Sequence, residues 1–217
     1  TPDAKGMLNP FAKHRAAPYS LASAVLACIL AAAFFYLDRI INEALRLKVK
    51  EVCVCECGTA YRVMKQLSGR QPFKVSSITE VHARYIREGR IKIDKTRFTG
   101  TVTYHDPCYL GRLGGDFESP RTVLSAIEGL ELVEMPRNRE ESLCCGAGGG
   151  GLWAEVDKDQ RFSVLRVQEA CDVGADVLVT ACPYCTVMFD DAVKVMGLSD
   201  RIIVADIAEL LWSAVKT

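Results

Sequence analysis

The chain has 217 residues, and its 27 Lys and Arg residues balance its 27 Asp and Glu residues, which leaves a formal net charge of zero. A neutral chain lacks the basic excess that attracts nucleic-acid phosphates, so we expect no nucleic-acid partner. Hydrophobic residues make up 49% of the chain and charged residues 25%, which excludes a disordered protein. The 10 cysteines favour metal or redox chemistry over a secreted disulfide scaffold, because such scaffolds are small and rich in loops.

The N-terminal segment, residues 1–37, ends in an apolar run from Ser20 to Leu37 that contains no charged residue. As a helix this run would extend roughly 27 Å, close to the thickness of a bilayer core. The basic residues Lys13 and Arg15 precede it, as in the positive-inside pattern. Two interpretations stay open, a transmembrane helix and a buried core helix rich in alanine. The chain begins with Thr rather than Met, so a processed product or a fragment is expected.

The second segment, residues 38–99, is predicted to contain three helices and one short strand. Ser77 has the character of a helix N-cap, Glu80 completes a capping box with it, and Gly89 offers a stop signal. The predicted ranges are helices at 38–48, 58–69 and 76–90 and a strand at 51–57.

The third segment, residues 100–217, alternates between strand and helix, which predicts an α/β fold with mostly parallel sheets. In the predicted helix over 119–130, Ser119 is expected to cap the N-terminus and Pro120 to occupy the first position. The other predicted ranges are strands at 101–106, 131–136 and 175–185, a helix at 157–174, and a final strand and helix within 201–215.

Five cysteines follow the predicted strands of this third segment, and carboxyl ends of parallel strands meet at one edge of a sheet. Thiolates select iron–sulfur clusters, zinc or copper. Zinc sites usually combine two Cys-x-x-Cys pairs, whereas here one such pair joins an adjacent pair and a lone cysteine. The glycine run 146–151 follows the adjacent pair, and its N–H groups can donate to cluster sulfurs. We therefore favour a cluster larger than one zinc ion, with candidate ligands Cys108, Cys144, Cys145, Cys182 and Cys185 and cofactor-binding glycines Gly146, Gly148 and Gly149.

The second segment resembles the third as a faded repeat. When Cys57 is aligned with Cys182, Ala60 falls opposite Cys185, so the earlier unit keeps one thiol of its Cys-x-x-Cys pair. Cys57 therefore has three open roles, a spare ligand, a ligand of a cubane cluster or a redox thiol. Cys53 and Cys55, at alternate positions of the predicted strand 51–57, are interpreted as packing residues.

The stretches "YHDPCYLGR" and "LCCGAGGG", with the Cys-x-x-Cys pair, resemble the cysteine-rich CCG domain. That domain occurs in the catalytic subunit of heterodisulfide reductases and in iron–sulfur subunits of glycolate oxidase, anaerobic glycerol-3-phosphate dehydrogenase and lactate-utilisation complexes. The resemblance covers residues 100–217 as a complete unit and 38–70 as a degenerate repeat, within the partial unit 38–99. "ECGTAYR" and "ITEVHARYIREGRIK" resemble heterodisulfide-reductase-like subunits of membrane redox complexes in sulfate reducers.

The resemblance implies an oxidoreductase subunit in which the five cysteines bind a non-cubane [4Fe–4S] cluster and a disulfide or thiol is the substrate. Cys145, as a ligand able to bridge irons, and His105, as a proton donor to a leaving thiolate, are the candidate catalytic residues. For His105 a local hydrogen bond that orients the Cys108 loop is the alternative. The implied location is the cytoplasmic side of a membrane complex. The implied partners are a ferredoxin-type iron–sulfur protein or segment, a membrane cytochrome or quinone-reactive subunit, or a flavoprotein.

Two other functions stay open. In the first, the cluster only relays electrons for a flavin-dependent dehydrogenase of 2-hydroxy acids or glycerol 3-phosphate. In the second, the cysteines hold structural zinc in a scaffold that docks a membrane partner.

Overall fold

The structure is a computed structural model that describes residues 35–55, 58–68, 71–94 and 99–215. The chain divides into two compact units, Thr1–Val49 and Lys50–Thr217. In the first unit the described residues form a helix over 35–46. Most of the apolar run that begins at Ser20 lies outside the described residues. No helix within the described ranges is both long and apolar enough to cross a membrane.

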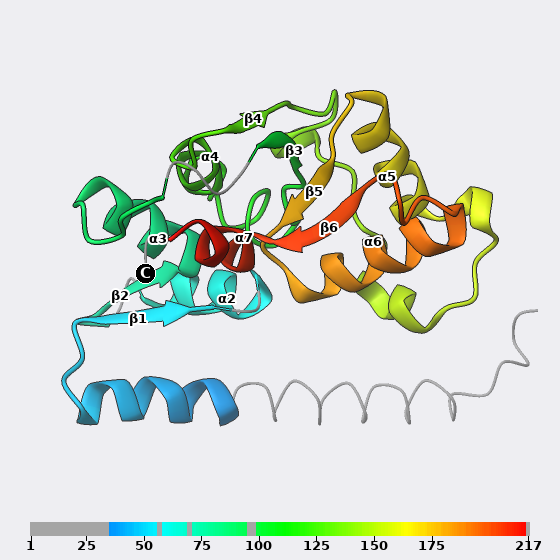
Figure 1. Cartoon of the computed structure of the whole chain (residues 1–217). Coiled ribbons are helices and arrows are strands. Elements are labelled where there is room, and N and C mark those ends of the chain that lie inside the picture. Colours follow the sequence, from blue (N-terminus) through cyan, green and yellow to red (C-terminus); the bar gives the residue numbers. More distant parts are fainter. Residues whose placement is uncertain (1–34, 56–57, 69–70, 95–98, 216–217) are drawn as a thin grey trace, which may run out of the picture. The chain divides into compact units, whose positions relative to one another are not determined.

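The second unit opens with a small parallel sheet of two strands, drawn in cyan in Figure 1. Cys53 pairs with Ser76 in its register. The predicted capping box forms, because the Ser77 side chain accepts the Glu80 N–H and the Glu80 side chain accepts the Ser77 N–H. The sequence did not predict the second strand of this sheet, because the last residue of that strand, Ser77, is also the N-cap of the next helix. In chain order the elements are β1 (Glu51–Val54), α2 (Gly58–Ser68), β2 (Lys74–Ser77) and α3 (Ile78–Arg87).

A parallel sheet of four strands follows, in the order β4-β3-β5-β6. This confirms the predicted fold class. The strands are β3 (Gly100–Tyr104), β4 (Leu130–Leu132), β5 (Val177–Thr180) and β6 (Ile203–Asp206). The helices are α4 (Glu118–Ser125), α5 (Phe162–Asp172), α6 (Pro183–Met196) and α7 (Ile207–Ala214). Three 3-10 turns, Arg139–Glu141, Gly148–Trp153 and Lys158–Gln160, lie in the loop between β4 and α5.

The strand order reverses direction between β3 and β5. From β3 the chain moves outward to β4, and it then returns to the other side of β3 to form β5 and β6. Such a switch point opens a crevice at the carboxyl ends of the two central strands, where α/β sheets bind ligands. The loops that follow β3 and β5 flank this crevice.

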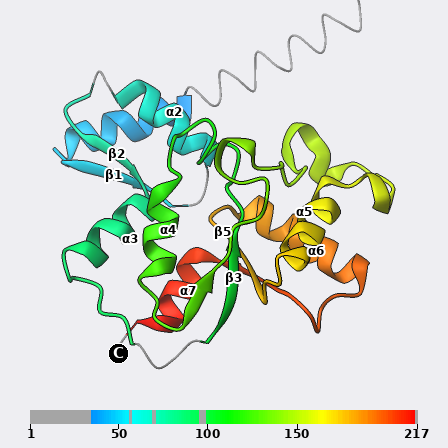
Figure 2. The same cartoon turned by 90° about the horizontal axis from the view of Figure 1, so that it is seen from above.

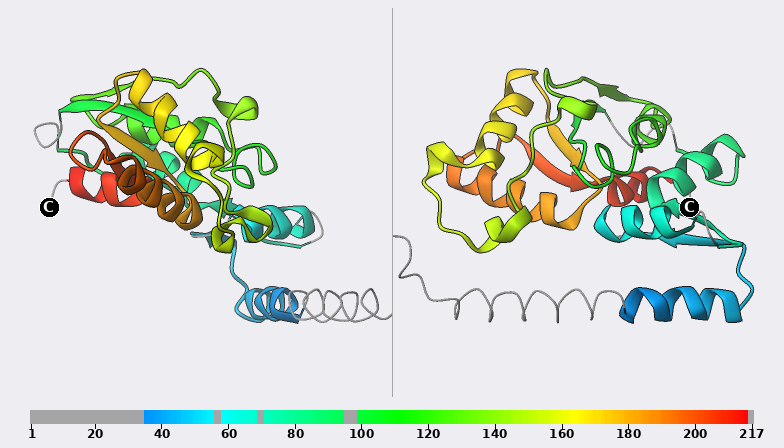
Figure 3. Two further views of the ribbon diagram at one scale, coloured as in Figure 1. Left: turned by 90° about the vertical axis from the view of Figure 1, so that its right-hand side faces the viewer. Right: turned by 180° about the vertical axis from the view of Figure 1, so that it is seen from behind.

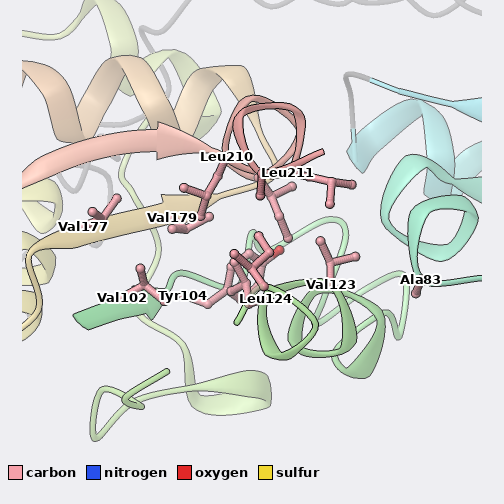
Figure 4. Close-up of a cluster of buried hydrophobic side chains, with 12 residues drawn as sticks. Ala83, Val102, Tyr104, Val123, Leu124, Val177, Val179, Leu210 and Leu211 are labelled. Carbon is pink, nitrogen blue, oxygen red and sulfur yellow. The ribbon is translucent and has the colours of Figure 1, made fainter. Parts of the chain in front are cut away.

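Helices cover both faces of the four-stranded sheet (Figures 2 and 3), with α4 and α7 on one face and α5 and α6 on the other. Side chains of a strand alternate between the two faces. Val177 and Val179 accordingly join the cluster of α4 and α7, which Figure 4 shows, whereas Leu178 joins the cluster of α5 and α6. All four residues of β5 are buried, as expected for a central parallel strand.

Two predicted helix starts are wrong. Helix α4 begins at Glu118 and the N-cap is Phe117, without a side-chain cap. Ser119 does not cap it, because Asp116 accepts the Ser119 N–H over 3.3 Å and so takes the capping role from the preceding loop.

The helix predicted over 157–174 begins later, as α5 at Phe162. The extended backbone of Arg161 separates it from the short turn Lys158–Gln160. The Arg161 side chain is fixed in this position, since it donates to the Val156 carbonyl and pairs with Asp191.

Candidate metal centre

The loops after three parallel strands bring all five predicted thiols to one cavity. Cys108 follows β3, and Cys144 and Cys145 follow β4. Cys182 and Cys185 lie at the start of α6, directly after β5. The five cysteines line a cavity of about 330 Å³. Segments distant in sequence therefore converge as the parallel sheet predicts.

Neighbouring thiols perturb one another's pKa in a continuous series. The Cys108 and Cys145 thiols lower the pKa of Cys144 well below its ordinary value, and the same contact raises the pKa of Cys108. Cys144 also raises the pKa of Cys145 to about 11. The Cys145 and Cys182 thiols raise the pKa of the buried Cys185. The pKa of each of these thiols therefore responds to a neighbouring thiol, as expected for side chains that line one cavity.

Backbone N–H groups also point at the sulfur atoms. The Gly146 N–H donates to Cys144 Sγ over 3.4 Å. Cys182 is the N-cap residue of α6, where the helix dipole favours negative charge. The Cys185 thiol, followed by the N–H groups of Cys185 and Tyr184, lowers the pKa of Cys182 to about 6. These donors favour the thiolate, which is the form that binds metal.

The glycine run forms a tight loop in which several positions require glycine. Gly149 and Gly150 have φ angles of 64° and 90°. At Gly151 a Cβ atom would lie 2.0 Å from the Gly146 carbonyl oxygen, so a side chain there is excluded. Gly148 and Gly149 line the cavity, whereas Gly146 faces an adjacent one and contributes its N–H.

Asp106 connects the loop after β3 to helix α4 by a buried ion pair and to the loop after β4 by hydrogen bonds. Arg121 donates to both carboxylate oxygens of Asp106, over 2.8 and 3.0 Å. The Asp106 carboxylate also accepts the Arg139 N–H over 2.8 Å, and the Asp106 carbonyl accepts the Ser142 hydroxyl over 3.1 Å. Arg112 completes the link by donating to the Ser142 carbonyl. Asp106, which as part of Asp-Pro indicates a turn, is therefore the anchor between two cysteine-bearing loops.

His105 is fully buried and is not among the residues that line the cavity. Burial, with the positive charge of Arg166, lowers its pKa well below the usual value. Arg166 Nε–H donates to His105 Nδ1 over 3.2 Å, which leaves the proton on Nε2. Nε2 has no hydrogen-bond partner among the described residues, and the ring packs edge-on against Phe189. The side-chain hydrogen bond of His105 comes from α5 rather than from the Cys108 loop, so the catalytic role and the orienting role both stay predictions.

Two buried arginines are absent from the sequence-based site. Arg121 holds Asp106, and Arg166 holds His105 and the Arg137 carbonyl. Each lies within a helix and is less than a tenth exposed. The sequence signal is weak, since an arginine in a helix is ordinarily solvated and its partners here are distant in the chain.

Aromatic side chains surround the mouth of the cavity. Tyr109, Trp153 and Tyr184 line it and are 37%, 86% and 54% exposed. Gly58 and Thr59, at the start of α2, complete the lining. A Cβ atom on Gly58 would lie 2.9 Å from the Tyr109 Cβ, so the glycine lets α2 approach the Cys108 loop.

Among the other cysteines that the structure describes, none lines the cavity. Cys57 falls outside the described residues. Cys53 is half-buried but Cys55 is exposed, so the interpretation of both as packing residues is wrong for Cys55. Cys171 is half-buried on α5. Within the described ranges, no group of three or more His, Cys, Asp and Glu side chains has the arrangement to hold a metal ion. The five thiols line a cavity and do not surround the position of a single metal ion.

Residues 102–190 match the family CCG, described as a cysteine-rich domain. The chain is 40% identical over 177 residues to a subunit of the dihydromethanophenazine:CoB–CoM heterodisulfide reductase of Methanosarcina barkeri, which covers 79% of this chain and 42% of that protein. It is 40% identical over 137 residues to the probable iron-sulfur-binding oxidoreductase FadF of Bacillus subtilis, covering 63% of this chain and 19% of the relative. It is 35% identical over 179 residues to EtfAB:quinone oxidoreductase of Syntrophomonas wolfei, covering 77% and 24%. The chain spans less than half the length of these relatives.

Proposed function

Because residues 102–190 of this chain are a CCG cysteine-rich domain, we propose that it is an iron–sulfur oxidoreductase subunit that exchanges electrons with a disulfide or thiol substrate. The observation that supports the proposal is the convergence of five thiols on one cavity at the switch point of a parallel sheet. The names of the similar proteins, an iron-sulfur-binding oxidoreductase and a heterodisulfide reductase subunit, support the same chemistry.

The donor set fits an iron–sulfur cluster of the non-cubane [4Fe–4S] type. Thiolate is the ligand that such clusters use, and five thiolates are one more than a cubane cluster takes. When bound, the cluster supplies single-electron transfer and an iron position for a substrate sulfur. In our proposal Cys108, Cys144, Cys145, Cys182 and Cys185 hold it, and N–H groups of the loop that contains Gly146, Gly148 and Gly149 lie against its sulfurs.

The other residues of the cavity have separate tasks. The ion pair of Asp106 and Arg121 fixes the spacing of the loops that carry the thiols. The rings of Trp153 and Tyr184 present an apolar entrance to an arriving substrate and limit the access of water. We propose Cys145 as the ligand nearest to the chemistry, and His105 as the residue that orients the Cys108 loop or moves a proton.

In this proposal electrons reach the cavity from a partner or from another segment of the protein. We propose a ferredoxin-type iron–sulfur protein or segment, or a flavoprotein, as the donor, and a membrane cytochrome or quinone-reactive subunit as a further partner. The location proposed is the cytoplasmic face of a membrane complex. The similarity to EtfAB:quinone oxidoreductase supports membership of a larger redox assembly.

A relay for a flavoprotein is the second candidate, and the similarity to FadF and EtfAB:quinone oxidoreductase favours it. In a relay the cluster passes electrons and no substrate enters the cavity. The exposed aromatic mouth is unnecessary for that task, which makes the two candidates distinguishable by experiment.

Anaerobic purification followed by iron and sulfide analysis tests the proposal. We expect about four iron and four sulfide per chain, as a [4Fe–4S] cluster requires. Cys182→Ser is expected to lose most of the iron, whereas Cys171→Ser, which removes a thiol remote from the cavity, keeps it. EPR spectra with and without a thiol substrate then separate disulfide chemistry, in which the cluster signal changes, from a relay, in which it does not. Stoichiometric zinc without sulfide would refute the cluster and support the scaffold.

A further inference from the structure

Cys53 on strand β1 and Cys55, directly after the strand ends at Val54, form a second pair of thiols outside the five-cysteine cavity. Cys53 and Cys55 have their Sγ atoms 3.9 Å apart. At the rise of about 3.3 Å per residue of extended backbone, Cα atoms two residues apart along the chain are separated by no more than roughly 6.6 Å. That separation is within the range that a disulfide spans, and the sulfur atoms need move by only about 2 Å to reach bonding distance. Figure 1 shows β1 leading into α2, whose first residues line the cavity.

The two thiols differ in the way that an attacking and a resolving cysteine differ. Cys55 is exposed, so a substrate can reach it. Cys53 is half-buried, and burial together with the neighbouring Cys55 thiol raises its pKa to about 12. A thiol in this state is a poor first nucleophile but lies beside Cys55 and so can complete an exchange begun there.

We propose that Cys53 and Cys55 form a redox-active dithiol that reduces disulfides of low molecular weight by thiol–disulfide exchange. The Cys55 thiolate attacks one sulfur of the disulfide, and the first substrate thiolate leaves with the proton that Cys55 gave up. Cys53 then attacks the Cys55 sulfur of the mixed disulfide, and the second substrate thiolate leaves with the Cys53 proton. The substrate gains two electrons, and the chain is left with a Cys53–Cys55 disulfide.

This site is independent of the proposed cluster in chemistry but uses the same class of substrate. The exchange is a two-electron reaction between sulfur atoms and needs no metal. Its position ahead of Gly58 and Thr59, which line the cavity, places the dithiol in the chain segment next to the candidate metal centre.

The test uses the whole 217-residue chain, prepared anaerobically and treated with excess oxidised glutathione. After alkylation of free thiols and denaturation, cleavage after glutamate releases the peptide Val52–Glu56, which contains Cys53 and Cys55 but not Cys57. We expect this peptide to have lost two hydrogen atoms, to carry no alkyl group and to carry no glutathione. In Cys53→Ser the same peptide is expected to retain one glutathione on Cys55. Cys171→Ser serves as the control and should behave as the unchanged chain does.

Three outcomes would overturn the dithiol: glutathione that persists on Cys55 in the unchanged chain, glutathione on both cysteines, or a peptide that remains fully reduced. Iron and sulfide are measured on the same samples. A chain that lacks the cluster but forms the Cys53–Cys55 disulfide contradicts the proposed function and supports the dithiol. A chain that holds the cluster but does not form this disulfide supports the proposed function and contradicts the dithiol.

Discussion

Replacing Asp106 with asparagine removes the negative charge that holds Arg121 between the two cysteine-bearing loops. The side chains of Arg121 and Asp106 are 7% and 1% exposed, so little water can replace the lost partner. Loss of one member of a buried pair costs about 3–5 kcal/mol of unfolding free energy. Arg121 keeps Glu134, with an N–O distance of 2.6 Å, and we therefore expect the low end, about 3 kcal/mol.

Anaerobic urea unfolding followed by circular dichroism measures this cost. With an m value of about 3 kcal/mol/M, the midpoint should fall by about 1 M. Glu118→Gln is the matched control, because Glu118 also pairs with an arginine, Arg139, but is 74% exposed. An exposed pair contributes about 0–1 kcal/mol, so the control should stay close to the unchanged chain.

The same substitution is expected to reduce bound iron, since the loops of Cys108 and Cys144 lose their shared anchor. A midpoint for Asp106→Asn as high as that for Glu118→Gln would refute the claim that the buried pair stabilises this part of the fold. A lowered midpoint with full iron content would refute the narrower claim that the pair sets the spacing of the thiols.

Three further outcomes are expected. Gly151→Ala should lose iron and sulfide, because its Cβ would lie 2.0 Å from a carbonyl oxygen. Gly148→Ala should keep them, because its Cβ would have no atom within 4 Å. Equal iron and sulfide contents in the two variants would contradict the loop geometry. Trp153→Ala should raise the KM for a disulfide at unchanged stability. Trp212→Ala should leave the KM unchanged, because Trp212 is also exposed but does not line the cavity. Equal KM values for the two variants would contradict the role of the aromatic mouth as the substrate entrance. Arg84 and Ser76 lower the pKa of Glu51 to about 2 from its ordinary 4.5, so its stabilisation is present above pH 4.5 and lost as the pH falls towards 2. Glu51→Gln should have a lower urea midpoint at neutral pH, and its midpoint should fall less than that of the unchanged chain between pH 4.5 and 2. An equal fall in both proteins would refute the claim that Glu51 causes this loss of stability.

The fold class could be predicted because alternating strand and helix patterns leave few arrangements open. The four buried residues of β5 and the capping box of Ser77 and Glu80 are local signals, and both are confirmed. Strand β2 was not predictable in this way, since its four residues end on the capping serine. The start of α4 was mispredicted for a similar reason, because the capping group comes from Asp116 in a loop that local patterns do not constrain.

The same distinction between local sequence signals and contacts made by packing applies to the candidate site. Cysteines placed after parallel strands must share one sheet edge, so their convergence followed from chain order alone. The residues that hold the loops in place did not follow, because the pairs of Asp106 with Arg121 and of His105 with Arg166 join positions brought together only by packing. Burial also changes what His105 can do, since a fully buried imidazole with a low pKa is neutral where an exposed one would titrate.

In our proposals the two strand–helix units differ in their sulfur chemistry, and the position of the thiols relative to each strand end gives the reason. After β5 the chain turns at once into α6, so Cys182 receives N–H groups from the helix start and faces the cavity. Cys53 lies on β1 and Cys55 just after the strand ends, and each thiol has the other as its neighbour. A thiol at a helix start is suited to a metal, whereas two thiols in contact are suited to each other. In our proposal the strand–helix unit of β1 and α2 therefore uses its thiols for exchange with each other, whereas the unit of β5 and α6 uses its thiols as metal ligands.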